Sequence, residues 1–148
     1  MSVKLPDMDR LPDPARVVIR RRIEWMDTDA AGIYHWTTVF RLAEAAEAAL
    51  HSALGTLGTF GHMPRVAVSA SFQNQLRFHD PVEVELAVEA IGRSSLTYRL
   101  AIACEAGPAA EGSITVVLID PETRRSSPWP DDVRRQLASA GLVSAPED

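Results

Sequence analysis

The segment from Thr38 to Leu54 constrains the fold more than any other, because its pattern predicts a helix with very little polar surface. Its polar side chains recur at every third or fourth position and form one narrow stripe, made of Arg41, Glu44, Glu47 and His51. Most other positions are apolar, and many are alanine. Thr37 and Thr38 are suited to cap its start, and Gly55 fits the position just after its end. So thin a polar face predicts a helix that is buried on most sides.

Alternating apolar and polar residues predict strands on both sides of this helix. One strand begins at Val17 and continues to Trp25. After a glycine-containing loop, further strands follow over 66–72, 82–89, 96–102 and 112–119, and a short amphipathic helix begins at Pro130. Glycine and proline turns between the strands indicate an antiparallel meander. A single helix buried by a single sheet implies an α+β fold in which a strongly curved sheet wraps around the helix.

The chain of 148 residues is the size of one domain. We expect an irregular leader over residues 1–15, one domain over residues 16–140 and a frayed tail over residues 141–148. Hydrophobic residues make up 46% of the chain, which is typical of a globular protein. No apolar run is long enough for a membrane span or a signal peptide. These features predict a soluble cytoplasmic protein.

Charge and cysteine content narrow the functional class. The net charge of −5 disfavours a nucleic-acid binder, although a few local arginines are enough to hold an anionic small ligand. Cys104 is the only cysteine, which excludes an intramolecular disulfide framework and a cysteine-based zinc cage. We therefore expect no structural metal.

Two carboxylates stand in the loop before the long helix, in the run Asp27-Thr28-Asp29-Ala30-Ala31-Gly32. They could simply be acidic loop or cap residues. A calcium loop fails because positions that need oxygen ligands hold Ala31 and Thr38. A phosphatase with an aspartyl nucleophile would need a larger, doubly wound fold, which the predicted meander does not supply. The remaining hypothesis is a carboxylate aimed at a carbonyl group held over the helix N-terminus, with N–H groups and aromatic walls from Tyr34, His35 and Trp36.

The run from Ile23 to Ile33, Ile-Glu-Trp-Met-Asp-Thr-Asp-Ala-Ala-Gly-Ile, resembles the 4-hydroxybenzoyl-CoA thioesterase family of hotdog-fold proteins. The family has a strand, an Asp-x-Asp-x-x-Gly loop and a long central helix in this order. The segment 64–72 and the turn 92–95 also lie where the family places them, so the resemblance covers Val17 to Ile119. It implies a hotdog fold, in which a curved antiparallel sheet wraps around one central helix, and the activity of an acyl-CoA thioesterase without a cofactor.

The resemblance also implies roles for individual residues. Asp29 matches the catalytic carboxylate, which is a nucleophile or a general base. Trp36 matches the residue in the first helical turn whose N–H polarises the thioester carbonyl. Glu44 has a supporting role at most. The substrate-binding candidates are Tyr34, His35, Met63 and Arg65.

The resemblance maps contacts with CoA phosphates to the turn Arg93-Ser94-Ser95. Arg124 and Arg125 follow the last strand, where they suit bidentate phosphate binding or simply form a charged exit loop. Hotdog proteins usually pair so that two sheets join. We therefore expect a homodimer or homotetramer with its active site at the subunit interface, with acyl-CoA as substrate and neither nucleic acid nor membrane as partner.

Two other functions stay open at this point. One is a non-catalytic acyl-CoA or acyl-carrier-protein binding module with the same fold, although a pure binder gains nothing from a carboxylate that faces an electrophilic carbonyl. The other is a hotdog enoyl hydratase, because Asp29 and His35 are one residue off the Asp-x4-His spacing of those enzymes. His35 is equally compatible with a ring that lies in solvent.

Overall fold

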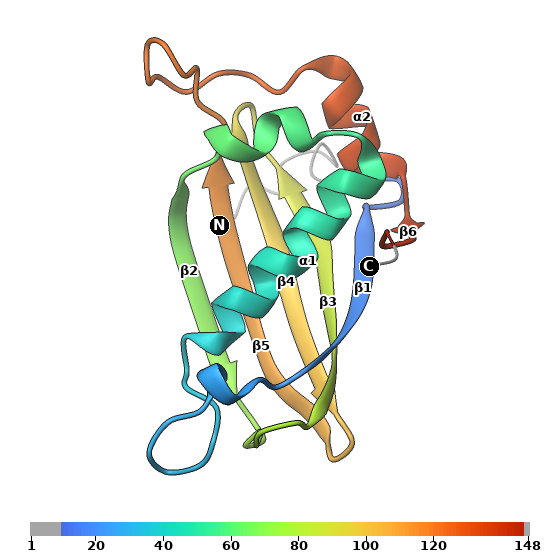
Figure 1. Cartoon of the computed structure of the whole chain (residues 1–148). Coiled ribbons are helices and arrows are strands. Elements are labelled where there is room, and N and C mark those ends of the chain that lie inside the picture. The colour runs from blue at the N-terminus through green and yellow to red at the C-terminus, as the bar shows by residue number, and fades with distance from the viewer. Residues whose placement is uncertain (1–9, 147–148) are drawn as a thin grey trace, which may run out of the picture.

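A six-stranded sheet curves around helix α1 (Thr38–Leu54) in the computed structural model, which describes residues 10–146 (Figure 1). The strands are β1 (Arg16–Arg22), β2 (Arg65–Phe72), β3 (Pro81–Ile91), β4 (Ser95–Cys104), β5 (Gly107–Val117) and β6 (Leu142–Val143). A second helix, α2 (Asp131–Ser139), and two 3₁₀ turns, η2 (Trp25–Asp27) and η3 (Leu57–His62), complete the chain. The predicted α+β hotdog fold is confirmed.

The strand order, β2-β5-β4-β3-β1-β6, departs from a simple meander. β3, β4 and β5 are consecutive antiparallel neighbours as predicted, but β2 pairs with β5 at the far edge and does not touch β3. β6 pairs in parallel with the start of β1, so the sheet is mixed, and residues 142–143 are not part of a frayed tail. β2 is therefore the edge strand on one side of the sheet, with β5 as its only neighbouring strand among the described residues.

The sheet curves because its ladders are interrupted. Register shifts occur between Val88 and Ala90 in β3 and between Ile102 and Ala103 in β4, and such bulges bend and twist a strand. Buried and less buried positions alternate along β4, which directs one row of side chains at α1. On the helix, Val39, Leu42 and Leu50 are fully buried against the concave face of the sheet.

The helix has the predicted bounds, but its cap differs from the prediction. Gly55 ends it in the left-handed conformation, with φ 73°, as expected of this position. Thr37 occupies the N-cap position, but neither threonine side chain caps the helix start. The Thr37 hydroxyl bonds with Nδ1 of His35 at 2.7 Å, and the Thr38 hydroxyl donates to the carbonyl of Asp27 at 3.1 Å. The helix start is thus tied to the preceding loop instead.

Two strand boundaries also differ. β1 ends at Arg22 rather than Trp25, because the Asp27 carboxylate accepts the Glu24 N–H and so stabilises the turn η2. Trp25 consequently lies on the surface, 75% exposed. The last long strand begins at Gly107 rather than at residue 112. Within residues 10–146, no helix is long and apolar enough to cross a bilayer.

Candidate functional site

The predicted site residues lie at opposite ends of α1. Asp29 and Trp36 lie in the loop that leads into its N-terminus, at the bottom of Figure 1. The turn 93–95 and the loop after β5 lie beyond its C-terminus, at the top. Helix α1 has 17 residues, and a rise of 1.5 Å per residue separates the two ends by about 25 Å. In a single chain the predicted catalytic residues and the predicted phosphate contacts thus lie at opposite ends of α1.

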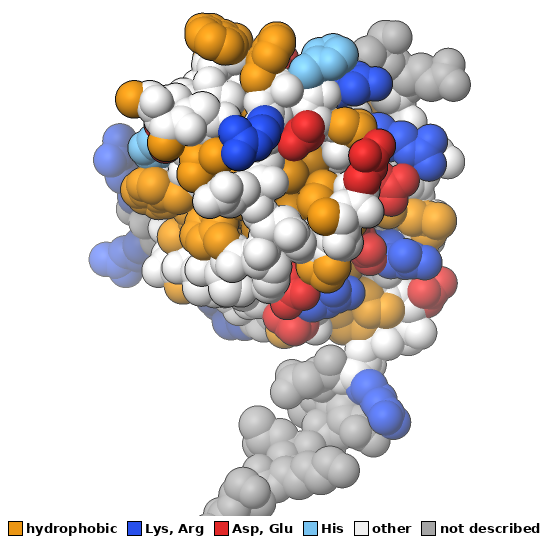
Figure 2. Space-filling model, turned by 90° about the horizontal axis from the view of Figure 1, so that it is seen from below, with side chains coloured by type: hydrophobic (Ala, Val, Ile, Leu, Met, Phe, Trp, Pro, Cys, Tyr) orange, Lys and Arg blue, Asp and Glu red, His pale blue; other side chains and the backbone are white. Residues whose placement is uncertain are grey.

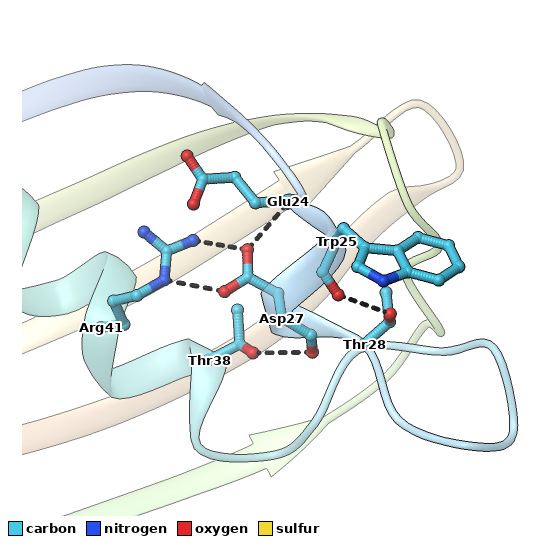
Figure 3. A network of polar contacts seen from close by, with 6 residues as sticks. All are labelled: Glu24, Trp25, Asp27, Thr28, Thr38 and Arg41. Atoms are coloured by element: carbon cyan, nitrogen blue, oxygen red, sulfur yellow. Dashed lines mark hydrogen bonds and ion pairs between the residues drawn. The ribbon is translucent and has the colours of Figure 1, made fainter.

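Asp27 is the buried centre of the loop before α1 (Figure 3). Its side chain is 3% exposed. Oδ1 accepts a hydrogen bond from Nε of Arg41 at 2.8 Å, and Oδ2 accepts one from Nη2 of Arg41 at 2.5 Å. The N–H of Glu24 donates to Oδ2 at 2.8 Å. Sequence reasoning missed this role. The available signal was Arg41, which is the only Lys or Arg in the predicted helix 38–54 and lies near its start.

Asp29, the second carboxylate of the motif, is exposed on the turn that follows. Its Oδ1 accepts the N–H of Ala31 at 2.8 Å, and its own N–H donates to the carbonyl of Ile33 at 2.9 Å. In the described part of the chain, Oδ2 has no hydrogen-bond partner. No group of three or more His, Cys, Asp or Glu side chains within residues 10–146 is placed to hold a metal ion.

The backbone N–H of Trp36 has no acceptor among residues 10–146. Its neighbours are bonded, since the N–H of His35 donates to the Asp27 carbonyl at 2.6 Å and the N–H of Thr37 donates to Nδ1 of His35 at 3.2 Å. Trp36 lies just before the N-cap residue Thr37 rather than in the first helical turn as predicted. Its free N–H therefore stands at the positive end of the α1 dipole.

Apolar side chains surround this end of the molecule. Figure 2 shows it from below, with hydrophobic and charged side chains interspersed. The Trp36 ring is 59% exposed and packs edge-on against Phe40. A shallow pocket of about 300 Å³ is lined by Tyr34, Trp36 and Phe72 among others. Tyr34 and Trp36, which the sequence predicts as aromatic walls of the site, therefore line one pocket.

Two predicted substrate contacts lie in the core instead of on an open surface. Met63 is 5% exposed. Tyr34 is 7% exposed, and its hydroxyl has no hydrogen-bond partner among the described residues. Burial, and secondarily the nearby Cys104, raise the pKa of this hydroxyl. His35 is exposed and bonded to Thr37.

A second polar network lies deeper along α1. Glu47 is 2% exposed and pairs with Arg65, whose Nη2 donates to Oε1 at 2.5 Å and Nη1 to Oε2 at 3.3 Å. One turn further, His51 is fully buried, with Nε2 2.7 Å from the Tyr98 hydroxyl and Nδ1 2.7 Å from the Thr56 hydroxyl. Burial lowers the pKa of His51 to about 4. Half of the polar stripe predicted on α1 is thus internal.

Backbone hydrogen bonds join the turn 93–95 to the two ends of the loop that follows β5. The carbonyl of Ser94 accepts the N–H of Leu118 at 2.7 Å, and the carbonyl of Arg93 accepts the N–H of Trp129 at 3.1 Å. The turn 93–95 therefore contacts both ends of the segment 118–129, within which Arg124 and Arg125 lie. The side chains of these arginines have no bonded partner in the described structure.

A family model, a curated relative and solved structures all indicate a thioesterase family for this chain. The model of the thioesterase-like superfamily matches residues 23–137. The chain is 27% identical over 139 residues to a 1,4-dihydroxy-2-naphthoyl-CoA hydrolase of Prochlorococcus marinus, which covers 85% of this chain and 92% of that protein. The solved 1,4-dihydroxy-2-naphthoyl-CoA thioesterase of Synechocystis has a TM-score of 0.73 at 20% identity, covering 84% of this chain and 96% of that one.

A further solved structure is a mutant 4-hydroxybenzoyl-CoA thioesterase in complex with 4-hydroxybenzoyl-CoA. It has a TM-score of 0.72 at 22% identity and covers 84% of this chain and 99% of that one. The expectation of a thioester hydrolase is confirmed at the level of the family, whose model spans the Asp-x-Asp loop, the helix and the sheet. The chain belongs to the thioesterase-like superfamily.

Proposed function

We propose that this protein hydrolyses an acyl-CoA thioester whose carbonyl oxygen is bound by the N–H of Trp36. The free N–H at the start of α1 is the observation that carries the proposal. Negative charge develops on the carbonyl oxygen in the transition state of acyl transfer. A preorganised N–H donor at the positive end of a helix stabilises that charge.

Asp29 is the proposed catalytic carboxylate. The Ala31 N–H fixes one oxygen, Oδ1, and leaves Oδ2 available to the substrate or to water. As a general base, Asp29 takes a proton from the attacking water. As a nucleophile, it forms an anhydride with the acyl group and releases the CoA thiolate, and water then hydrolyses the anhydride. Neither route requires a metal or a redox cofactor.

The CoA phosphates are assigned to the opposite end of α1, with Arg93, Ser94, Ser95, Arg124 and Arg125. Because the two ends of α1 are about 25 Å apart, we propose that two chains share each site. A two-fold axis that pairs β2 with the β2 of a second copy brings the partner's turn 93–95 to the Asp29 end. β2 suits this role, since it is an open edge with exposed Val66, Val68 and Phe72.

The aromatic walls near Trp36 and the names of the relatives favour an aromatic acyl group. The test is a thiol-release assay with benzoyl-, 4-hydroxybenzoyl-, 1,4-dihydroxy-2-naphthoyl- and octanoyl-CoA, run beside Asp29→Asn. We expect turnover of at least one aryl-CoA and a loss of about a hundredfold or more in the variant. Binding without turnover of any thioester would favour the non-catalytic module, and an unchanged Asp29→Asn would exclude Asp29 from catalysis.

A further inference from the structure

A buried tryptophan and an arginine from the chain after β5 hold the turn 92–95, which joins β3 to β4. Trp129 is 3% exposed, and its indole Nε1 donates to the carbonyl of Ser95 at 3.0 Å. Arg134, in α2, donates from Nη2 to the carbonyl of Gly92 at 2.7 Å and to the carbonyl of Arg93 at 3.3 Å. Neither Trp129 nor Arg134 is among the predicted CoA contacts, so both side chains still need a role.

All four carbonyls of the turn 92–95 accept hydrogen bonds from the chain that follows β5. Besides the side-chain bonds, the backbone N–H of Trp129 donates to the Arg93 carbonyl at 3.1 Å. The N–H of Leu118 donates to the Ser94 carbonyl at 2.7 Å. Because each carbonyl belongs to a planar peptide group, these bonds also fix the directions of the N–H groups in the turn.

The N–H groups of Arg93 and Ser94 point away from Arg134. In a trans peptide the C=O and the N–H point in opposite directions, so the Arg93 N–H opposes the Gly92 carbonyl and the Ser94 N–H opposes the Arg93 carbonyl. Neither N–H has an acceptor among residues 10–146. Two successive N–H groups without acceptors in a turn form a donor site of the kind that binds phosphate.

The charge of Arg134 strengthens these donors. A hydrogen bond to a carbonyl polarises its peptide group, which makes the N–H of that group a better donor. A charged donor such as a guanidinium forms hydrogen bonds roughly twice as strong as those of a neutral donor. In the described part of the chain, no carboxylate pairs with Arg134. Its charge therefore acts on the turn without a counter-ion.

We propose that Trp129 and Arg134 are positioning residues that hold the turn 92–95 so that the N–H groups of Arg93 and Ser94 donate to a phosphate of CoA. This role rests on the proposed function for its ligand, and it adds two main-chain donors to the side-chain contacts proposed above. Because the turn is already ordered, less free energy is lost to ordering it when CoA binds.

Calorimetric titration with CoA tests the two side chains. Trp129→Phe keeps an aromatic ring in the core and removes the indole donor, and Arg134→Met removes the bonds to the two carbonyls. Arg135→Met is the matched control, because it removes the same charge from the next residue of α2, which is exposed and whose side chain has no bond to the described residues. We expect Kd for CoA to rise about tenfold in Arg134→Met and about threefold in Trp129→Phe, and to stay within about twofold in Arg135→Met.

The backbone amide signals of Arg93 and Ser94 in nuclear magnetic resonance spectra give a readout that a loss of stability alone would not produce. In the wild type these signals should shift when CoA is added, and should shift much less with pantetheine, which lacks the phosphates. In Arg134→Met the shifts caused by CoA should shrink, whereas in Arg135→Met they should match those of the wild type.

Signals of Arg93 and Ser94 that do not move when CoA is added overturn the inference. An equal rise in Kd for Arg134→Met and Arg135→Met also overturns it, because Arg134 would then act only as a charge. The same holds for an unchanged Kd in both Arg134→Met and Trp129→Phe. A failure of the proposed function looks different, because no thioester would be hydrolysed while CoA binding would still depend on Arg134.

Discussion

Arg41 forms a bidentate ion pair with Asp27, in which Nε donates to Oδ1 at 2.8 Å and Nη2 donates to Oδ2 at 2.5 Å. The pair joins the first turn of α1 to the loop that precedes it, and the Asp27 carbonyl also receives the N–H of His35 and the hydroxyl of Thr38. Asp29 and Trp36 both lie between Asp27 and Arg41 in the sequence, within the segment that this pair closes. The first aspartate of the motif thus supports the geometry in which the second is proposed to act.

Asp27→Asn should therefore lower stability. Breaking a buried ion pair costs about 3–5 kcal/mol, but Arg41 is 39% exposed and its charge is partly solvated. We expect a loss of about 2 kcal/mol, which corresponds to a fall in Tm of roughly 4–8 °C for a domain of this size.

Asp29→Asn is the matched control, since it is the same change two residues away on an exposed side chain. Its Tm should stay within about 2 °C of the wild type, because exposed substitutions rarely exceed about 0.5 kcal/mol. Thermal unfolding followed by circular dichroism compares the two. Equal Tm values for both variants would contradict the assignment of Asp27 as the structural member of the motif.

His51 predicts how stability depends on pH. Its pKa is about 4 in the folded chain and about 6.5 when exposed, so the unfolded state binds more protons between these values. Stability should therefore fall as pH drops from 6.5 towards 4, by up to about 3 kcal/mol from this group. The surrounding groups are Tyr98, Thr56 and, one turn earlier, Glu47.

Urea unfolding at several pH values measures this contribution. His51→Gln removes the titrating ring, and the slope of unfolding free energy against pH between 6.5 and 4 should flatten, although the variant is less stable at neutral pH. A variant that keeps the full wild-type slope would show that other groups cause it.

The sequence predicted the elements that depend on local pattern. The bounds of α1 followed from the periodicity between Thr38 and Leu54 together with Gly55. The position of β2 could not follow, because its pairing with β5 is a long-range contact that alternation does not encode. Gly112 in β5 is consistent with this pairing, since a Cβ at that position would collide with the Ser69 carbonyl of β2.

The ion pair between Glu47 and Arg65 could not be predicted from the sequence for a similar reason. Arg65 follows a loop and Glu47 lies on the helix, and only the fold brings them together. Glu47 and His51 belong to the one polar stripe predicted on the helix, but both side chains are internal. The roles of Asp29 and Trp36 came from the family resemblance of the loop motif, and they stay predictions.

Arg93→Ala tests the proposed phosphate contact. The guanidinium of Arg93 has no partner within the described residues, so its loss should not affect stability. We expect kcat/KM for an acyl-CoA to fall about tenfold, because a charge-assisted hydrogen bond is lost. The same acyl group on N-acetylcysteamine, which lacks phosphates, should be hydrolysed at nearly the wild-type rate. An equal fall for both substrates would place Arg93 outside the phosphate site.

Complementation between two defective variants tests whether chains share a site. Asp29→Asn loses the proposed catalytic group, and Arg93→Ala loses the proposed phosphate contact at the other end of α1. In a heterodimer with shared sites, one site carries both defects and the other carries neither. Random pairing makes half of the dimers heterodimers, so co-refolding should restore about a quarter of the wild-type sites.

The restored activity should exceed the mean of the two parents when acyl-CoA is used below its KM. A simple mixture of the separately folded variants, without exchange, is the control and should show only that mean. If each site belonged to a single chain, every site in the heterodimer would keep its own defect. Co-refolding would then add nothing, and the proposed pairing through β2 would have to be abandoned.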